Sequence, residues 1–329
     1  MSLPDDSTPA PVAAETPPLS LGPATTAVRY TEIGYLLAAV GALLFSTKAV
    51  AIKLAYMESV SAETLLALRM GLALPIYVAI GLLAVADRRR RAVALPAART
   101  AGKAVLVGLL GYWFSSYADF LGLQYITAQF ERLILFTYPL FVVVLGALFF
   151  RQPRTLRTVA AIGVSYAGLA LIFVEKRTTL GPDVAVGSAL VVVAALAFAL
   201  YQLLAKPVIA ALGPRLFTCV AMTGAAAGAF GQFLLTHPPG DLAVSRSVAV
   251  LSLFIAIGAT VLPSFFLNAA LHRIPAQANA TIGTLSPVMT IALAVVVLGE
   301  GLTIADVAGA TLVLAGVGWF TLADRRRPR

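Results

Sequence analysis

The chain has 329 residues, of which 60% are hydrophobic and only 12% are Asp, Glu, Lys or Arg. Soluble domains carry roughly 25% charged residues, so this composition excludes an ordinary soluble globular protein. The net charge is +9, and the single cysteine, Cys219, excludes an intrachain disulfide and a cysteine zinc site. These numbers fit a polytopic membrane protein, because ten helical spans of about 20 residues occupy about 200 positions.

The two ends of the chain differ from the rest. Residues 1–29 are rich in proline and small polar residues and have neither the basic nor the apolar region of a signal peptide. We expect a disordered cytoplasmic tail over these residues. A short basic cytoplasmic tail is expected over residues 324–329.

Ten apolar runs lie between these tails, separated by short polar breaks. Each is close to the length that crosses a hydrocarbon core. Ten-residue blocks of alternating hydrophobicity are absent, so the runs indicate transmembrane helices rather than a β-barrel. The spans are predicted at 34–55, 62–85, 103–122, 127–150, 157–174, 185–205, 214–236, 248–270, 275–298 and 304–322.

Basic residues are unevenly divided between the two sides of the membrane. With the N-terminus inside, 17 Lys and Arg residues lie in cytoplasmic segments, and three lie in outer loops. The positive-inside rule then predicts two cytoplasmic termini and an even number of spans in a prokaryotic cytoplasmic (inner) membrane. The run Arg88–Arg91 indicates topology and lipid headgroup contact rather than nucleic-acid binding.

The sequence contains an internal repeat. A shift of 148 residues aligns LQYITAQ (123–129) with LHRIPAQ (271–277) and Pro139 with Pro287, and a shift of 153 aligns the first two helices of each copy. Five spans per copy make the copies enter the membrane from opposite sides, as in many secondary transporters. We therefore predict an all-α integral membrane fold of two inverted five-helix repeats. The repeats are expected over 30–176 and 177–323.

Several stretches resemble the EamA-type transporters of the drug/metabolite transporter superfamily. FSTKAVAIKLAY (45–56), LILFTYPLFVVVLGALFFRQPRT (133–155) and SPVMTIALAVVVLGEGLT (286–303) resemble the first, fourth and ninth helices of that family. The resemblance implies a ten-helix exporter or exchanger of small metabolites, often amino acids, with alternating access around a central cavity. A glutamate that follows the fourth and ninth helices in the family is present as Glu300 but replaced by Gln152, which indicates a loop or helix-cap role.

Charged residues inside the predicted spans are candidates for function, because a charge at mid-bilayer costs about 2.5–3.5 kcal/mol on insertion scales. Lys48 lies near the centre of the first span, Asp119 near the outer end of the third, and Glu131 just inside the fourth. We predict that they bind or guide a charged or zwitterionic solute. The alternative is a set of structural ion pairs, such as Arg69 with Glu131.

The repeat favours the functional interpretation, because Lys48 aligns with Tyr201 and Glu131 with Asn279, so the charges occur in one copy only. Aromatic residues near the charges would suit an amino acid or an aromatic amine, whose amine binds a carboxylate or a ring face. The alternative is that these rings are packing or interface residues. The predicted substrate-binding residues are Ser46, Thr47, Lys48, Trp113, Tyr117, Asp119, Glu131 and Tyr138.

Three prolines interrupt predicted spans. Pro139 and Pro287 lie at equivalent mid-span positions of the fourth and ninth spans, and Pro263 lies in the eighth. Proline frees a backbone carbonyl and kinks a helix, which suits a gate. We predict a gating role for these residues, with ordinary helix kinks as the alternative.

Other classes of function lack their signatures. GVSYA (163–167) departs from GxSxG at Ala167, and no HExxH, P-loop or dinucleotide motif occurs. We therefore predict no catalytic residue, cofactor or metal site. A membrane enzyme, or a channel or scaffold without alternating access, is the alternative.

Transport without an ATP motif must follow a gradient, by facilitated diffusion or by exchange with protons. Asp119 or Glu131 is the predicted proton-linked group, because burial in the membrane favours a neutral carboxyl. The expected partners are a small-molecule substrate, protons and membrane lipids, without nucleic acid. A monomer is compatible with the sequence, which leaves the oligomeric state open.

Overall fold

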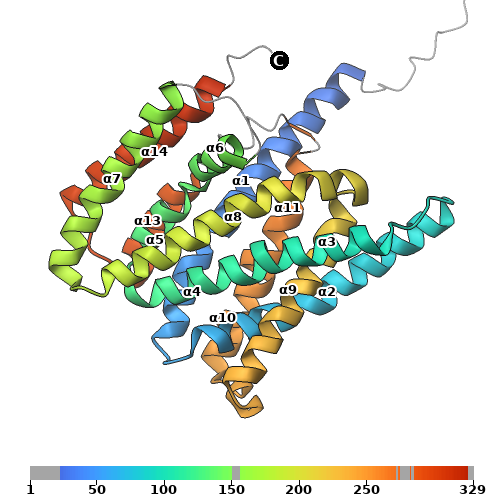
Figure 1. Cartoon of the computed structure of the whole chain (residues 1–329), viewed down its shortest axis with the longest axis horizontal. Helices are drawn as coiled ribbons and strands as arrows, with labels where there is room; N and C mark the ends of the chain where they lie inside the picture. The colour runs from blue at the N-terminus through green and yellow to red at the C-terminus, as the bar shows by residue number, and fades with distance from the viewer. Residues whose placement is uncertain (1–22, 150–155, 272, 275–281, 283–284, 325–329) are drawn as a thin grey trace, which may run out of the picture.

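The computed structural model describes residues 23–149, 156–271, 273–274, 282 and 285–324 (Figure 1). Within these ranges the ordered elements are all helices, and no strand is found. Eight helical segments are long and apolar enough to cross a membrane, and two shorter apolar helices lie at 285–298 and 304–319. The predicted all-helical membrane fold is therefore confirmed, with the ten apolar segments in the predicted order.

The first half of the chain forms five membrane-length segments, two of which are interrupted. Its helices are α1 (Pro23–Tyr56), α2 (Ala62–Arg90), α3 (Ala98–Gly108), α4 (Ser115–Tyr125), α5 (Ala128–Leu135), α6 (Tyr138–Phe149) and α7 (Leu156–Leu180). The second half contains α8 (Val184–Leu212), α9 (Pro214–Thr236), α10 (Arg246–Ala256), α11 (Leu262–Leu271), α13 (Leu285–Leu298) and α14 (Ile304–Asp324).

Side-chain caps explain where several of these helices begin. The hydroxyls of Ser61, Thr127 and Ser245 each accept a hydrogen bond from the backbone N–H three residues later, at 3.1–3.2 Å. Such caps satisfy N–H groups that a helix leaves unpaired in its first turn. Between α8 and α9, Gly213 has a φ of 76°, a left-handed conformation that favours glycine, and Pro214 then opens the next helix.

Two π-helical turns interrupt equivalent helices. One covers Leu109–Phe114 between α3 and α4, and the other covers Ile257–Val261 between α10 and α11. The two turns begin 148 residues apart, which is the shift of the sequence repeat. The sequence predicts continuous spans here, because a π-turn adds a residue to a helix without interrupting its apolar run.

Helices of one half pack against helices of the other. The first helix, α1, contacts α11 and α13, α2 contacts α9, and α4 contacts α8. The last helices of the halves, α7 and α14, lie side by side along one flank of the molecule (Figure 1). Their backbones approach closely, since a Cβ at Gly168 would lie 2.5 Å from the carbonyl oxygen of Gly309. The two halves thus form one interlocked bundle.

Some predicted boundaries differ from the structure. Helix α1 begins at Pro23, inside the segment assigned to the N-terminal tail, while residues 1–22 lie outside the described residues. The ninth helix is described from Leu285, and most of 275–284, where that span is predicted to begin, is outside the described ranges. The predicted C-terminal tail falls on residues 325–329, which are likewise not described, apart from Asp324 at the end of α14.

Candidate substrate site

Five charged side chains meet in the interior of the bundle, and we call them the ionic cluster. They come from α1, α2, α4 and α5, all in the first half of the chain. Each residue is at most 5% exposed to solvent. The members of the ionic cluster are Lys48, Arg69, Asp119, Glu131 and Arg132.

Lys48 and Asp119 form the tightest contact of the ionic cluster. The Lys48 Nζ donates to Asp119 Oδ2 at 2.7 Å, although the residues are 71 positions apart in the sequence. The ammonium also lies 5.5 Å from the centre of the Phe45 ring and 5.9 Å from that of Phe120. Cation–π contacts of this kind stabilise a desolvated cation. The pair therefore joins α1 to α4 with aromatic side chains around it.

The remaining polar atoms of the ionic cluster are poorly satisfied. Arg69 Nε donates to Thr260 Oγ1 at 2.9 Å, but its Nη1 has no hydrogen-bond partner among the described residues. Arg132 Nε lies 3.8 Å from Glu131 Oε2, beyond hydrogen-bond distance. Arg132 Nε and Nη2, both oxygens of Glu131 and Asp119 Oδ1 are buried without a partner. Such groups are rare in native interiors and require an explanation.

The ion pair that the sequence suggested as an alternative is not the one formed. Arg69 binds Thr260 of the second half instead of Glu131, and Glu131 lies beside Arg132. Thr260 lies on the π-turn Ile257–Val261, which brings its hydroxyl to α2. The sequence contains no signal for the contact between Arg69 and Thr260, because it joins helices that are distant in the chain.

Ser46 and Thr47, predicted to bind substrate, make structural contacts. Ser46 Oγ donates to the Ala42 carbonyl at 2.7 Å and lies 3.1 Å from Ser286 Oγ, while Thr290 donates to the Ser46 carbonyl. Thr47 Oγ1 donates to the Leu44 carbonyl at 2.6 Å. Ser46 therefore links α1 to α13 directly beside Lys48.

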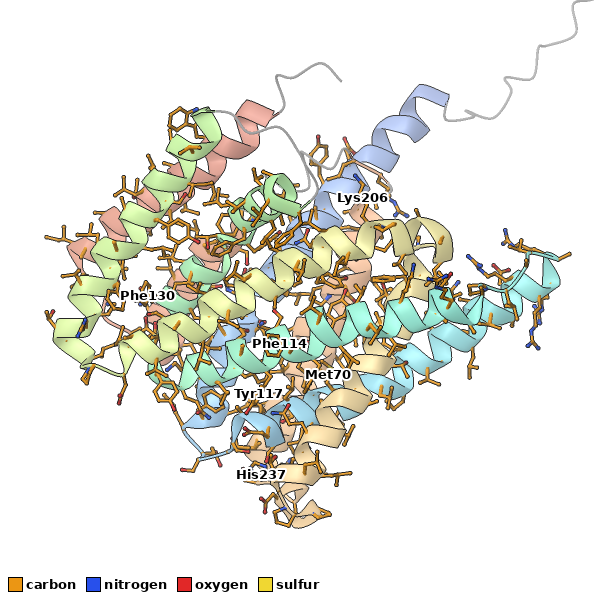
Figure 2. All side chains as sticks on the ribbon, in the orientation of Figure 1. Met70, Phe114, Tyr117, Phe130, Lys206 and His237 are labelled. Atoms are coloured by element: carbon orange, nitrogen blue, oxygen red, sulfur yellow. The ribbon has the colours of Figure 1, made fainter. Side chains whose placement is uncertain are left out.

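The predicted aromatic residues contact neighbouring helices. Trp113 Nε1 donates to Gln232 Oε1 on α9, and the Tyr117 hydroxyl donates to Glu63 Oε1 on α2, both at 2.7 Å. Tyr117 packs against the same apolar core as Met70 of α2, and Figure 2 labels both residues. Tyr138 packs edge-on against Phe198 of α8, 5.1 Å between ring centres. These three contacts were not predicted, since they depend on which helices are neighbours.

Two of the predicted prolines follow a break in their helix. Pro139 lies in the first turn of α6, after the non-helical residues Phe136 and Thr137, and Thr137 Oγ1 donates back to the Ile134 carbonyl. Pro263 is the second residue of α11, directly after a π-turn. Pro287 is the third residue of α13. The helices are therefore interrupted just before Pro139 and Pro263. The gating role of the three prolines stays a prediction.

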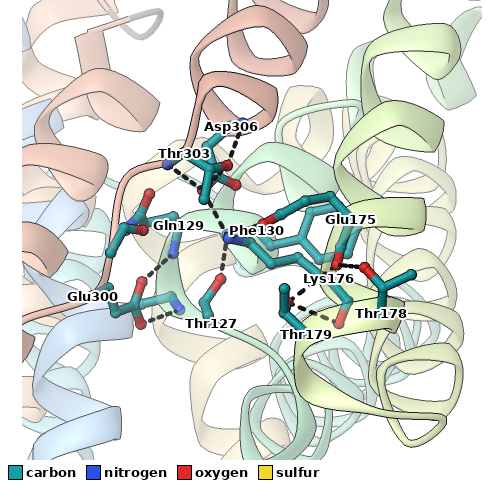
Figure 3. A network of polar contacts seen from close by, with 12 residues as sticks. Thr127, Gln129, Phe130, Glu175, Lys176, Thr178, Thr179, Glu300, Thr303 and Asp306 are labelled. Carbon is teal, nitrogen blue, oxygen red and sulfur yellow. Dashed lines mark hydrogen bonds and ion pairs between the residues drawn. The ribbon is translucent and has the colours of Figure 1, made fainter.

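A second polar network lies at the predicted outer face of the membrane. It is formed near the ends of α7 and α13 and the starts of α5 and α14 (Figure 3). Lys176 Nζ donates to Asp306 Oδ2 at 2.7 Å, and the same oxygen accepts from Thr303 N and Oγ1 at 3.1 and 3.0 Å. We call these residues the peripheral network. From the sequence, Lys176 is one of the three basic residues in outer loops, and Thr303 and Asp306 have the spacing of a helix capping motif.

Glu300 connects the peripheral network to α5. Its carboxylate accepts from the backbone N–H groups of Ala128 and Gln129, at 2.8 and 3.2 Å (Figure 3). A carboxylate at a helix N-terminus satisfies unpaired donors and complements the helix dipole. The helix-cap role inferred for Glu300 is confirmed, with the detail that the capped helix belongs to the first half.

The described residues include no group of three or more His, Cys, Asp or Glu side chains that would hold a metal ion. Figure 2 also places Lys206 and His237 at opposite ends of the molecule. The chemistry available in the interior is therefore that of the ionic cluster, which offers buried N–H donors, carboxylate oxygens and aromatic rings.

Comparison with known proteins identifies this architecture. The model of the EamA-like transporter family matches residues 32–174 and again 185–322. The chain belongs to the EamA-like transporter family. It is thus a multi-pass membrane protein of the drug/metabolite transporter superfamily, with one family unit in each half.

Known relatives of this EamA-like chain are also transporters by name. It is 26% identical over 292 residues to the uncharacterized transporter YcbK of Bacillus subtilis (strain 168), covering 86% of this chain and 90% of the relative. An uncharacterized transporter of Archaeoglobus fulgidus is 27% identical over 221 residues, covering 65% and 75%. A protein crystal structure aligns with a TM-score of 0.59 and 18% identity, over 91% of this chain and 98% of the other, a likeness of fold alone.

Proposed function

We propose that this chain is a secondary or facilitative transporter that exports small charged metabolites by alternating access, with amino acids and amines as the first candidates. The observation that carries the proposal is the ionic cluster. Five charged groups are buried where α1, α2, α4 and α5 meet, and several of their donors and acceptors are unpartnered. Buried charges inside a membrane bundle usually mark the path of a substrate or an ion.

The interlocked halves support alternating access. Thr260 of the second half bonds Arg69 in the first, and Ser286 and Thr290 contact Ser46, so both halves border the ionic cluster. In transporters with inverted repeats, rocking of one half against the other opens a midplane site to each side in turn. All five charged residues are closed to solvent in this conformation. We assign it to an occluded step, with both termini in the cytoplasm of a prokaryote.

Proton coupling is proposed at Asp119 and Glu131. The two carboxyl groups are near enough to repel each other when both are ionised, and Glu131 also lies in the field of Arg132 on its own helix and of Lys48 and Lys53 on α1. α13 and the first 17 residues of α8, which pack against α5, contain no ionisable residue, and α7 brings Lys176 and Glu175 at its far end. A proton between the two carboxyl groups would give each a hydrogen bond.

The proposal is tested in two steps. Purified protein is first screened by thermal shift against amino acids, amines, nucleosides, sugar phosphates and carboxylates. A stabilising compound is then used in proteoliposomes at imposed pH gradients, in which we expect saturable flux that responds to the gradient. Product analysis of the same samples detects any chemical conversion, which would indicate an enzyme instead.

The variant Asp119→Asn with Glu131→Gln tests the coupling. Both changes keep the shape of the side chains and remove the proton sites, so we expect flux that no longer responds to the pH gradient. Asp87→Asn is the matched control, since Asp87 is exposed near the end of α2. Proton-dependent flux that survives in the double variant would refute the coupling, and the absence of any flux in the wild type would refute the transport proposal.

A further inference from the structure

The ionic cluster has more positive than negative groups. It contains three basic residues and two acidic ones, so it keeps an excess cation even with both carboxyls ionised. The segments at 150–155 and 275–284 contain no Asp or Glu, and therefore cannot supply the missing negative charge. Because an uncompensated buried charge is strongly unfavourable, the excess points to a binding partner of negative charge.

Arg132 has the geometry for that partner. Its Nε and Nη2 are both buried and without a hydrogen-bond partner. These two nitrogens lie on one edge of the guanidinium, with N–H groups parallel, which is the edge that binds both oxygens of a carboxylate. By contrast, the Lys48 ammonium is already bound by Asp119 at 2.7 Å. Arg132 rather than Lys48 is thus the open anion-binding group.

We propose that the Nε and Nη2 edge of Arg132 binds the carboxylate of a small organic monoanion, with Arg69 as a second cation beside the site. This inference rests on the proposed transport function and, among the small charged metabolites proposed there, favours monocarboxylates over amino acids and amines. The Phe45 ring lies 5.2 Å from Arg132 Cζ, and the Phe120 ring lies 5.5 Å from Arg69 Cζ. Lys48 Nζ lies 5.5 and 5.9 Å from the same two rings, so both arginines border the Lys48–Asp119 pair. An apolar group on the ligand would pack against these two rings.

Glu131 provides a way to regulate this site. Its Oε2 lies 3.8 Å from Arg132 Nε, close enough to compete with an incoming carboxylate but too far to bond. A proton on Glu131 removes that competition and lets Glu131 donate to Asp119. The proton and the organic anion would then bind together, which corresponds to cotransport of the two rather than to exchange.

Matched ligands separate net charge from shape. The probes are 3-phenylpropanoate, phenylalanine and phenethylamine, and the aliphatic set 4-methylpentanoate, leucine and 3-methylbutylamine, measured by thermal shift and calorimetry. Each set keeps its apolar body while its charge changes from negative to zwitterionic to positive. We expect one or both carboxylates to bind the wild type at least about tenfold more tightly than the matched zwitterion, and the amine to bind least.

Variants of Arg132 and Glu131 then test the roles of these two residues. Arg132→Gln should weaken carboxylate binding at least about tenfold, and Arg132→Lys should do so as well, because lysine keeps the charge but loses the two-nitrogen edge. Arg177→Gln, an exposed residue near the end of α7, should leave affinity unchanged. Glu131→Gln should make carboxylate binding independent of pH. Size-exclusion profiles and ligand-free melting show whether each variant folds. If Arg132→Gln does not fold, the carboxylate affinity of Arg132→Lys tests the anion site.

The outcomes distinguish the two proposals. Full carboxylate affinity in the Arg132 variants, tighter binding of the zwitterion or amine, or no carboxylate binding at all would overturn the anion site. Flux of an amine that ignores Arg132 would overturn it too, while leaving the transport function intact. Carboxylate binding that depends on Arg132 without any flux in proteoliposomes would support the site and refute transport.

Discussion

Two buried Lys–Asp pairs in this molecule have the same separation and different surroundings. Lys48–Asp119 and Lys176–Asp306 are both 2.7 Å apart with side chains at most 8% exposed. Asp306 Oδ2 also accepts two hydrogen bonds from Thr303, whereas Asp119 Oδ1 has no donor among the described residues. The N–O distance is thus the same for the Lys176–Asp306 pair, which completes a helix cap, and for the Lys48–Asp119 pair, which lies among unsatisfied donors and acceptors. The number of unsatisfied neighbouring atoms within the described ranges separates the two pairs: Glu175 Oε2 lies 3.3 Å from Lys176 Nζ without a hydrogen bond, whereas the ionic cluster has six such atoms.

The largest expected effect is that of breaking the central pair. Lys48→Met leaves Asp119 as a buried charge without its partner, so the free energy of unfolding in detergent should fall by about 3–5 kcal/mol. Lys53→Met, one turn along the same helix and only partly buried, is the control and should change it by less than about 1 kcal/mol. Equal effects in both variants would show that the central pair is not special to stability.

Breaking the peripheral pair should cost less. Lys176→Met leaves Asp306 with its two donors from Thr303, so we expect a loss of about 1.5–3 kcal/mol, the value of one charged hydrogen bond. Ligand affinity should be unchanged in the folded variant, as measured by calorimetry. A large change in affinity here would remove the distinction between the two pairs.

Removal of the Glu300 cap should have a smaller effect. Glu300→Ala deletes the acceptor for two N–H groups of α5, and loss of a cap typically lowers stability by about 1 kcal/mol. Thermal melting checks the change, with Gln124→Ala, an exposed residue just before α5, as the control. If melting is unaffected by Glu300→Ala, the cap contributes nothing measurable.

The smallest expected effect concerns Tyr117. Tyr117→Phe removes a part-buried hydrogen bond to Glu63 and keeps the ring, which should lower stability by about 0.5 kcal/mol and leave flux unchanged. Tyr125→Phe, on the exposed end of α4, is the control for both measurements. A clear change in substrate affinity would place Tyr117 in the transport path, as the sequence predicts.

Hydrophobic length and loop charge made the ten spans and the repeat predictable, because lipid tolerates only long apolar helices and basic residues resist translocation. The sequence also singled out Lys48, Asp119 and Glu131, since charges are rare in such helices. It did not reveal that Lys48 pairs with Asp119 or that Arg69 bonds Thr260, because these partners depend on tertiary packing. The sequence did not single out Arg132, since an open guanidinium edge is visible only once its neighbours are placed.

Helix α5 has a mechanical consequence that follows from its two ends. It is eight residues long, or about 12 Å, and carries both Glu131 and Arg132. Glu300 of the opposite half holds its first N–H groups, and the helix stops at Leu135, just before the segment with Pro139. We therefore expect α5 to rotate as a short rigid unit held at its two ends. A shift of the second half at the membrane face would then reorient Glu131 and Arg132 near the middle of α5.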